Sequence, residues 1–149
     1  MSLEKNIMTE LKAAMKAKDQ AALRGIRAIK AAILLSKTDG SGKELDESGE
    51  IKMLQKLVKQ RQDSYDIFIK QGREDLASVE KEEIDVISKF LPKQLSKEEL
   101  IPIVQEIINT VGASSMKDMG KVMGMASSSL SGQADGKTLS GIVKELLNK

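Results

Sequence analysis

The sequence predicts an all-α protein with an N-terminal four-helix domain, residues 1–91, followed by a small C-terminal three-helix bundle, residues 92–149. Two observations support this fold class. Apolar residues recur every three or four positions through most of the chain, which is helical spacing. No segment alternates apolar and polar residues with a period of two, so we expect no sheet. The boundary is placed at Pro92, because proline disfavours helix at the residue before it.

Four helices are expected before this boundary. The loop between the second and third is expected over residues 37–50, which are polar and rich in glycine. The third helix is expected from about Gly49 to Gly72. The residues expected to face the core are Leu3, Ile7, Leu11 and Met15; Leu23, Ile26, Ile29, Ile33 and Leu34; Ile51, Leu54, Leu57, Val58, Tyr65 and Phe68; and Leu76, Val79, Ile84, Ile87 and Leu91.

Three shorter helices are expected after Pro92. Ser96 and Glu99 have the spacing of a capping box, which predicts where the first begins. The second carries Gly120 and Gly124, each of which costs a helix about 1 kcal/mol relative to alanine. That cost suggests close contact at this face, either with a neighbouring helix, which we expect, or with a docked backbone.

Composition excludes several classes of site. The chain has 149 residues with no histidine and no cysteine, so a zinc site built on these ligands, a cysteine nucleophile and a Ser-His-Asp triad are ruled out. We expect no metal and no cofactor. The amino-terminal run is charged and amphipathic, and no apolar run approaches membrane-spanning length. These features predict a cytoplasmic location without membrane association.

The stretch SLSGQADGKTLSG, residues 129–141, superficially resembles a phosphate-binding loop. A Walker-type loop needs four residues between its first glycine and the Gly-Lys pair, whereas Gly132 and Gly136 enclose three, and it must follow a strand. The stretch is better explained as a turn in which Asp135 caps the next helix. The free amides of that helix start and the adjacent Lys137 could still meet an anion, although a solvated cap is the simpler interpretation.

Charge is unevenly distributed despite a net charge of +2. Residues 1–37 hold eight lysines and arginines against three acids, and Lys12, Lys16, Arg24 and Arg27 are candidates for contact with nucleic-acid phosphates. The scarcity of aromatic residues argues against single-strand binding by base stacking, so a folded nucleic acid is the more plausible ligand. By contrast, the acidic run from Glu80 to Asp85 is interpreted as a solvated helix face rather than an acid–base or magnesium site.

Four segments together resemble the GatB/YqeY family over nearly the whole chain. They are LVKQRQDSYDIFIKQGREDL, EIDVISKFLPKQLSKEEL, GASSMKDMGKVMG and GQADGKTLSGIVKELL. The family comprises stand-alone proteins of about this length and the tail of the B subunit of the aspartyl/glutamyl-tRNA amidotransferase. The resemblance implies that residues 93–149 are similar to the tail that grips tRNA, with Lys121, Asp135, Gly136 and Lys137 on a surface facing tRNA or a partner. The family's amidotransferase label refers to chemistry carried by other domains, since the catalytic cradle of the B subunit is missing here.

We therefore predict a non-catalytic accessory protein that binds tRNA or a tRNA-handling enzyme, with no catalytic residue of its own. The alternative is a protein–protein adaptor that docks a partner through the C-terminal helical bundle. A third reading, an amidase or amidotransferase using one of Ser127, Ser128 or Ser129 with a lysine, requires a rigidly held serine beside a desolvated lysine. The helical pattern instead makes these serines the wet face of a helix.

Overall fold

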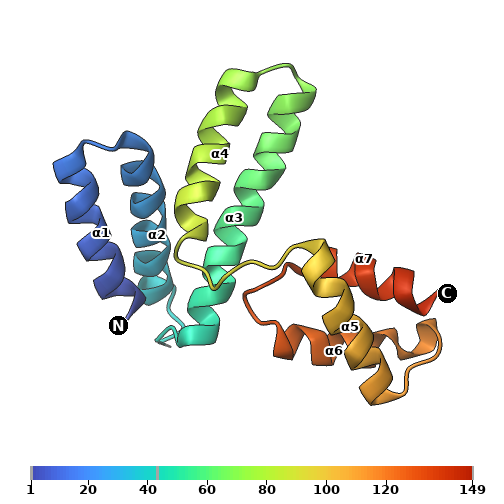
Figure 1. Cartoon of the computed structure of the whole chain (residues 1–149). Coiled ribbons are helices and arrows are strands. Elements are labelled where there is room, and N and C mark those ends of the chain that lie inside the picture. Colours follow the sequence, from blue (N-terminus) through green and yellow to red (C-terminus); the bar gives the residue numbers. More distant parts are fainter. Residues whose placement is uncertain (1, 43, 149) are drawn as a thin grey trace. The chain divides into compact units, whose positions relative to one another are not determined.

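The computed structural model describes residues 2–42 and 44–148, and these residues form helices and no strand, as the sequence predicts (Figure 1). The α-helices are α1 (Leu3–Ala17), α2 (Gln20–Thr38), α3 (Glu47–Lys70), α4 (Glu74–Ser88), α5 (Lys97–Val111), α6 (Met119–Ser129) and α7 (Gly136–Leu147). A short 3-10 turn, η1 (Met116–Asp118), precedes α6. The connection between α2 and α3 is shorter than predicted, because α2 continues to Thr38 and α3 begins at Glu47. Within the described residues, no helix combines the length and apolar character needed to cross a membrane.

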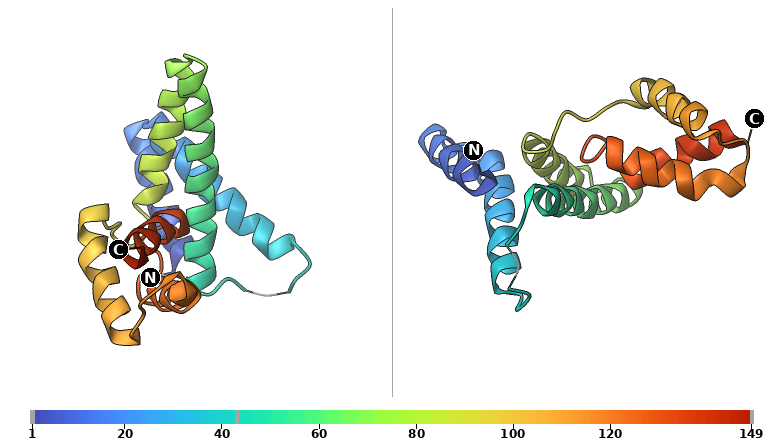
Figure 2. Two further views of the ribbon diagram at one scale, coloured as in Figure 1. Left: turned by 90° about the vertical axis from the view of Figure 1, so that its right-hand side faces the viewer. Right: turned by 90° about the horizontal axis from the view of Figure 1, so that it is seen from below.

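The chain divides into two compact units, Met1–Leu91 and Pro92–Lys149, each with its own core. Helices α1 to α4 build the N-terminal unit, and α5 to α7 build the C-terminal unit (Figure 2).

Side-chain caps start most of the helices where the sequence allows them. Asp19 accepts a hydrogen bond from the Ala22 amide at 3.0 Å, and Asp46 accepts one from the Gly49 amide at 2.7 Å. Ser96 and Glu99 form the predicted capping box at the start of α5. Each cap satisfies an amide that the first helical turn leaves without a partner. Local sequence therefore specifies these helix starts through contacts within one helical turn.

The N-terminal core is built from two helix pairs, α1 with α2 and α3 with α4, joined by the packing of α2 against α4. Its most buried side chains come from all four helices: Ile7, Ile29, Leu54 and Ile87 are each at most 1% exposed. The spacing of apolar residues on α2 predicts this arrangement, because one wide stripe has to meet both α1 and α4.

Gly25 sets how closely α2 approaches α4. A Cβ atom built at Gly25 would lie 2.6 Å from Val86 Cγ1 and 2.8 Å from Val86 Cβ. The second contact matters more, because Val86 Cβ is attached directly to the α4 backbone and no rotamer change moves it away. Glycine at position 25 is therefore a packing requirement, which the sequence analysis did not recognise.

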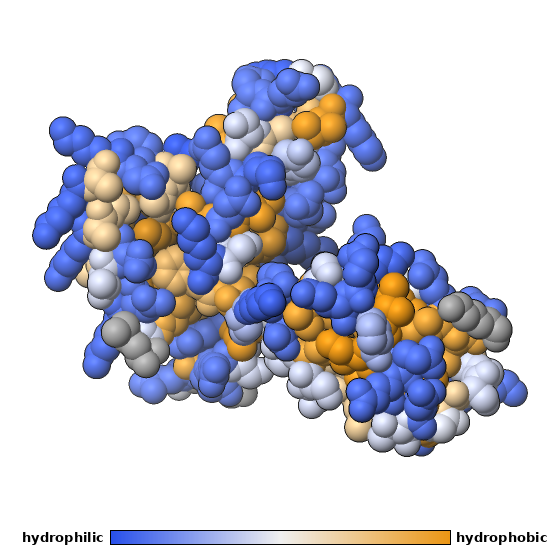
Figure 3. All heavy atoms as spheres, in the orientation of Figure 1, coloured by the Kyte–Doolittle hydropathy of each residue, from blue (hydrophilic) through white to orange (hydrophobic). Residues whose placement is uncertain are grey.

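Helix α4 extends beyond α2 toward the turn that joins it to α3 (Figure 1). Leu76 and Val79, predicted to face the core, are 36% and 39% exposed, so that prediction is wrong for both. The cause is that α2 begins opposite Glu82, as the Arg24–Glu82 ion pair records, and so covers only the later turns of α4. Apolar side chains also reach the surface near this end of the hairpin in Figure 3.

Two further residues predicted to face the core also lie outward. Met15 on α1 is 58% exposed and Leu34 on α2 is 62% exposed. The buried stripe of α2 is centred on Ile26, Ile29 and Ile33, and Leu34 lies just past its edge. Helical spacing alone does not set the width of a buried stripe, because that depends on how many helices pack against it.

The C-terminal core is a three-helix bundle in which α5, α6 and α7 pack against one another. Leu100, Val104, Val122, Ala126 and Val143 are fully buried at its centre. The segment before α5 is tied to the turn before α7, since the Leu95 amide donates to the Gln133 carbonyl at 2.9 Å. This contact fixes the α6–α7 connection on which the candidate anion-binding residues lie.

Substituting Gly25→Ala tests the close approach of α2 and α4. Alanine improves helix propensity by about 1 kcal/mol, but overpacking typically costs about 1–3 kcal/mol. We expect a net loss of stability for the N-terminal unit in urea denaturation of the full chain, partly reversed in the double variant G25A/V86A. A G25A chain as stable as the wild type would contradict the packing role.

Candidate functional sites

The turn before α7 is a side-chain-capped helix start, as predicted. Asp135 Oδ1 accepts from the Thr138 amide at 2.7 Å, and Oδ2 accepts from the Thr138 hydroxyl at 3.0 Å. Both carboxylate oxygens are thereby used within the first turn. Gly132, with φ 78°, lies in the left-handed region that the turn requires. Asp135 is therefore a structural residue of α7, and its negative charge partly offsets the attraction of this helix start for an anion.

The predicted lysines of the C-terminal unit lie on the outer faces of two packed helices. Lys121 on α6 and Lys137 on α7 are both exposed, and Lys144 lies two turns beyond Lys137 on the same face of α7. None of the three forms an ion pair with a described carboxylate. Helix α6 contains no acidic residue, and the one on α7, Glu145, pairs with Lys97 of α5 at 3.3 Å. The outer faces of α6 and α7 are therefore basic.

Glycines lie beside these lysines on the same outer faces. A Cβ built at Gly120, Gly124, Gly136 or Gly141 would have no heavy atom within 4 Å among its surroundings. The expectation that a neighbouring helix packs against Gly120 and Gly124 is therefore wrong. The buried face of α6 is formed by Val122 and Ala126, and the two glycines lie on the exposed side of the helix. Their backbone is open to a molecule from outside the chain.

The three serines of α6 do not form a catalytic arrangement. Ser127, Ser128 and Ser129 are all exposed. In the described part of the chain, no lysine nitrogen lies within hydrogen-bonding distance of their hydroxyls. They belong to the solvated face of α6, as their position in the helical pattern predicts.

Of the four basic residues predicted to bind phosphates on the first two helices, three are exposed and one is engaged in an ion pair. Lys12, Lys16 and Arg27 are exposed. Arg24 is half-buried and pairs with Glu82 of α4, and its Nε is buried without a hydrogen-bond partner in the described residues. Arg24 therefore joins α2 to α4 and presents little free charge to a ligand.

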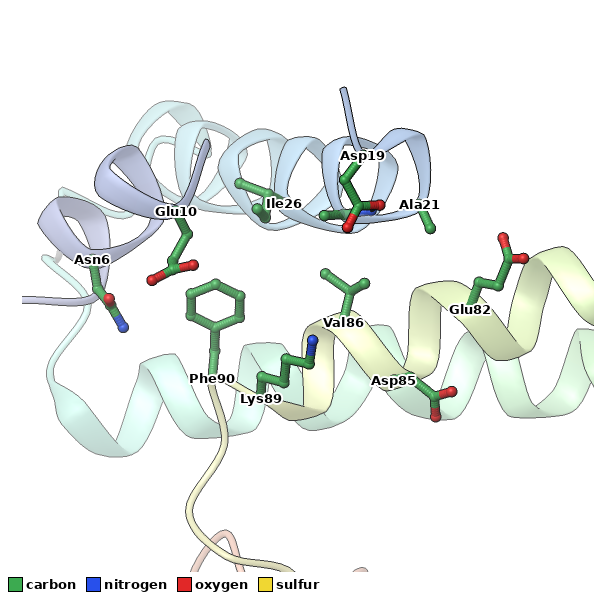
Figure 4. Close-up of a pocket in the computed structure, with 11 residues that line it drawn as sticks. Asn6, Glu10, Asp19, Ala21, Ile26, Glu82, Asp85, Val86, Lys89 and Phe90 are labelled. Carbon is green, nitrogen blue, oxygen red and sulfur yellow. The ribbon is translucent and has the colours of Figure 1, made fainter. Parts of the chain in front are cut away.

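A groove of about 440 Å³ runs between α1, α2 and α4 of the N-terminal unit (Figure 4). Ile26, Val86 and Phe90 form its apolar floor, and Phe90 points from the end of α4 toward α1 and α2. The carboxyl groups on its walls come from α1, from α4 and from the cap of α2: Glu10, Glu82, Asp85 and Asp19. Lys89 is the basic residue among the lining residues. The sequence analysis treated the acidic run of α4 as a solvated face and did not find this groove.

The acidic walls are not arranged as a metal site. Over residues 2–42 and 44–148, no three carboxylates come together closely enough to hold an ion. Glu82 pairs with Arg24, and Asp85 lies 3.7 Å from Lys81. Glu80 lies one turn from Glu83. Burial raises the pKa of the Glu80 carboxyl above its usual value of 4.5, and the negative charge of Glu83 raises this pKa further, whereas the positive charge of Arg61 lowers it. The negative charge of α4 is thus crowded and only partly balanced.

The fold and these surfaces define an all-helical protein whose two units carry exposed faces of opposite charge. The chain belongs to the YqeY-like family: the model of Yqey-like proteins matches residues 4–147. This confirms the resemblance that the sequence motifs indicate.

Several yeast proteins are similar to part of the chain. All carry the name "Altered inheritance of mitochondria protein 41, mitochondrial". The one from Lachancea thermotolerans is 38% identical over 86 residues, which are 58% of this chain and 46% of the relative. The one from Saccharomyces cerevisiae (strain YJM789) is 38% identical over 82 residues, 55% of this chain and 44% of the relative. The one from Eremothecium gossypii is 36% identical over 86 residues, 58% and 47% respectively. The match spans less than half the length of these relatives.

The expectation of a cytoplasmic location is wrong by this comparison. The yeast relatives carry the name of a mitochondrial protein, and this finding contradicts the expectation. That expectation relied on the absence of a recognisable signal and of a long apolar run, and such absences do not distinguish between compartments.

Substituting Glu80→Gln tests the crowding of charge on α4. Because the folded-state pKa is raised, the penalty on the charged form is absent below about pH 4.5, where the carboxyl is protonated in both folded and unfolded chains. The penalty is fully present once the pH exceeds the folded-state pKa. We expect E80Q to be more stable than the wild type in urea at pH 7 and equally stable near pH 3. Glu106→Gln, at an exposed position of α5, controls for the loss of one charge, and a destabilised E80Q at pH 7 would contradict the argument.

Proposed function

We propose that the chain is a non-catalytic accessory protein that binds folded RNA of the tRNA class through the outer faces of α6 and α7. The observation that carries the proposal is the combination of unpaired lysines and open glycines on these faces. Lys121 lies beside Gly120 and Gly124 on α6, and Lys137 and Lys144 flank Gly141 on α7. The family resemblance of this unit to a tRNA-gripping tail supports the same assignment.

The glycines favour a backbone as the ligand. A glycine in a helix interior costs about 1 kcal/mol relative to alanine, and no contact within the chain explains that cost at Gly120 or Gly124. Where no side chain stands out from a helix, a ribose–phosphate backbone can approach the helix closely, and an adjacent lysine can reach a phosphate oxygen. Recognition of this kind depends on shape and phosphate contacts, as is common for folded RNA.

The distribution of charge within the C-terminal unit supports the same face. Three of its six acidic residues, Glu98, Glu99 and Glu106, lie on α5, and two others, Asp118 and Asp135, lie at the starts of α6 and α7. Helix α6 has none, and Glu145 of α7 is paired with Lys97. A polyanion is thus attracted to one side of the bundle and repelled from the other. In the N-terminal unit, Lys12, Lys16 and Arg27 are proposed as secondary phosphate contacts, whereas Arg24 is engaged with Glu82.

A catalytic role receives less support from the side chains. The candidate serines are exposed on a helix and lack a hydrogen-bonded base, whereas a serine nucleophile needs one. The adaptor alternative for the C-terminal bundle requires an apolar docking face. The large apolar side chains exposed there among the described residues are Met116 and Met125. The apolar surface available for docking a partner is therefore small.

The lysine contacts are tested by titrating unmodified tRNA into the full chain at two salt concentrations. We expect Lys121→Ala and Lys137→Ala each to weaken binding several-fold at low salt. Each should also reduce the dependence of affinity on salt by roughly one released counterion. Lys81→Ala removes the same charge from the acidic helix α4 and should leave binding unchanged. Absence of tRNA binding by the wild type at low salt would overturn the proposal.

Substitutions at the two glycines of α6 should have opposite effects on stability and on tRNA affinity. Gly120→Ala and Gly124→Ala should stabilise the C-terminal unit by up to about 1 kcal/mol each, because the added methyl group meets nothing. The same substitutions should weaken tRNA binding by holding the RNA backbone away from the helix. Denaturation and tRNA titration of the same samples measure both effects. Stabilised variants that bind tRNA as well as the wild type would show that the RNA does not approach this face closely.

A further inference from the structure

We infer that the groove of the N-terminal unit and the uncovered end of α4 form one docking track for a basic amphipathic helix of a partner protein. This track is separate from the proposed RNA-binding faces, which belong to the other unit. Its residues are the apolar side chains of one α4 face, Leu76, Val79 and Val86, together with the acidic residues along it.

The apolar stripe of α4 continues beyond the part of α4 that α2 covers. Leu76, Val79 and Val86 share one face of α4, because they lie three and seven positions apart along the helix. Val86 is 8% exposed and packs against Gly25 of α2, whereas Leu76 and Val79 are 36% and 39% exposed. A helix placed beyond the start of α2 would cover them as α2 covers Val86. The exposed part of the stripe, from Leu76 to Val79, is about 4.5 Å long at 1.5 Å per residue, or nearly one turn of α4, and Val86 continues the stripe under α2 at the edge of the groove.

Charge identifies the chemistry of the partner. Helix α4 carries six carboxylates and one lysine, Lys81. Three of the carboxylates are paired, Asp75 with Arg73, Glu82 with Arg24 and Asp85 with Lys81, and Glu74, Glu80 and Glu83 form no ion pair with a described residue. Asp19 and Glu10 add carboxylates from the opposite wall of the groove, where Figure 4 shows Glu10 directed toward Phe90. A partner with leucine-like residues along one side and lysine or arginine on its flanks meets both the apolar stripe and the acidic edges.

The same charges disfavour other occupants. RNA and anionic lipid would both place negative groups against the carboxylates of α4. A second copy docked by two-fold symmetry would bring one acidic α4 stripe against another, because such an interface uses the same patch on both molecules. A basic helix is the occupant that relieves the crowding recorded at Glu80 and Glu83.

The probe is a fluorescein-labelled synthetic peptide of about 18 residues, with leucine at helical i, i+3, i+4, i+7 spacing and lysine elsewhere. A peptide of the same composition with the leucines scrambled is its control. Anisotropy titration of the full chain should give at least tenfold tighter binding for the striped peptide. Val79→Lys and Leu76→Lys, at exposed positions that leave the core intact, should each weaken it at least tenfold.

Ile67→Lys is the matched control, since Ile67 is 53% exposed on α3 and the substitution changes charge equally. It should leave peptide binding unchanged. Equal binding of the scrambled peptide, or equal losses in I67K and V79K, would reduce the effect to general charge attraction and overturn the inference. A wild-type dimer by light scattering that V79K converts to a monomer would instead assign the stripe to a second copy, and would also overturn it.

Discussion

The N-terminal unit depends on the contact between α2 and α4. Each of the pairs α1–α2 and α3–α4 buries only part of its apolar surface by itself, and the α2–α4 contact is the main one between them. Gly25 permits it by removing a side chain from the place that Val86 occupies. Arg24 and Glu82 then connect the two helices at the edge of the contact. Without this approach Ile29 and Ile87, both 0% exposed, would lose their shared core.

The same contact determines which surfaces remain available. Because α2 starts opposite Glu82, the first turns of α4 stay uncovered, and the groove lies where α1, α2 and α4 converge. Helix α4 carries six carboxylates and one lysine, whereas the basic faces of the C-terminal unit lie on α6 and α7. The chain thus presents faces of both charge signs although its net charge is only +2.

The sequence predicted helix content and helix starts well, because both are local. Ser96 with Glu99 and Asp135 cap helices through contacts within one turn, and these caps were predicted from spacing alone. Tertiary proximity was harder to predict. Close packing was predicted at Gly120 and Gly124, where the structure is open, and not at Gly25, where the structure is tight. A single glycine in an apolar stripe gives no sign of which helix will face it. The groove was missed for a similar reason, since its walls come from residues 6–26 and 82–90, which only the fold brings together.

The glycines of α6 also affect the dynamics of the C-terminal unit. With eleven residues, two of them glycines at which an added Cβ would meet no heavy atom within 4 Å, α6 is shorter than the fifteen-residue α5 and gains no side-chain packing at those two positions. Its fully buried side chains are Val122 and Ala126, and Met119 and Met123 pack half-buried against the same core. Its amides should therefore exchange with solvent deuterium sooner than those of α5. A ligand that lies along α6 would bind a helix that opens transiently, and part of its binding energy would go into holding that helix closed.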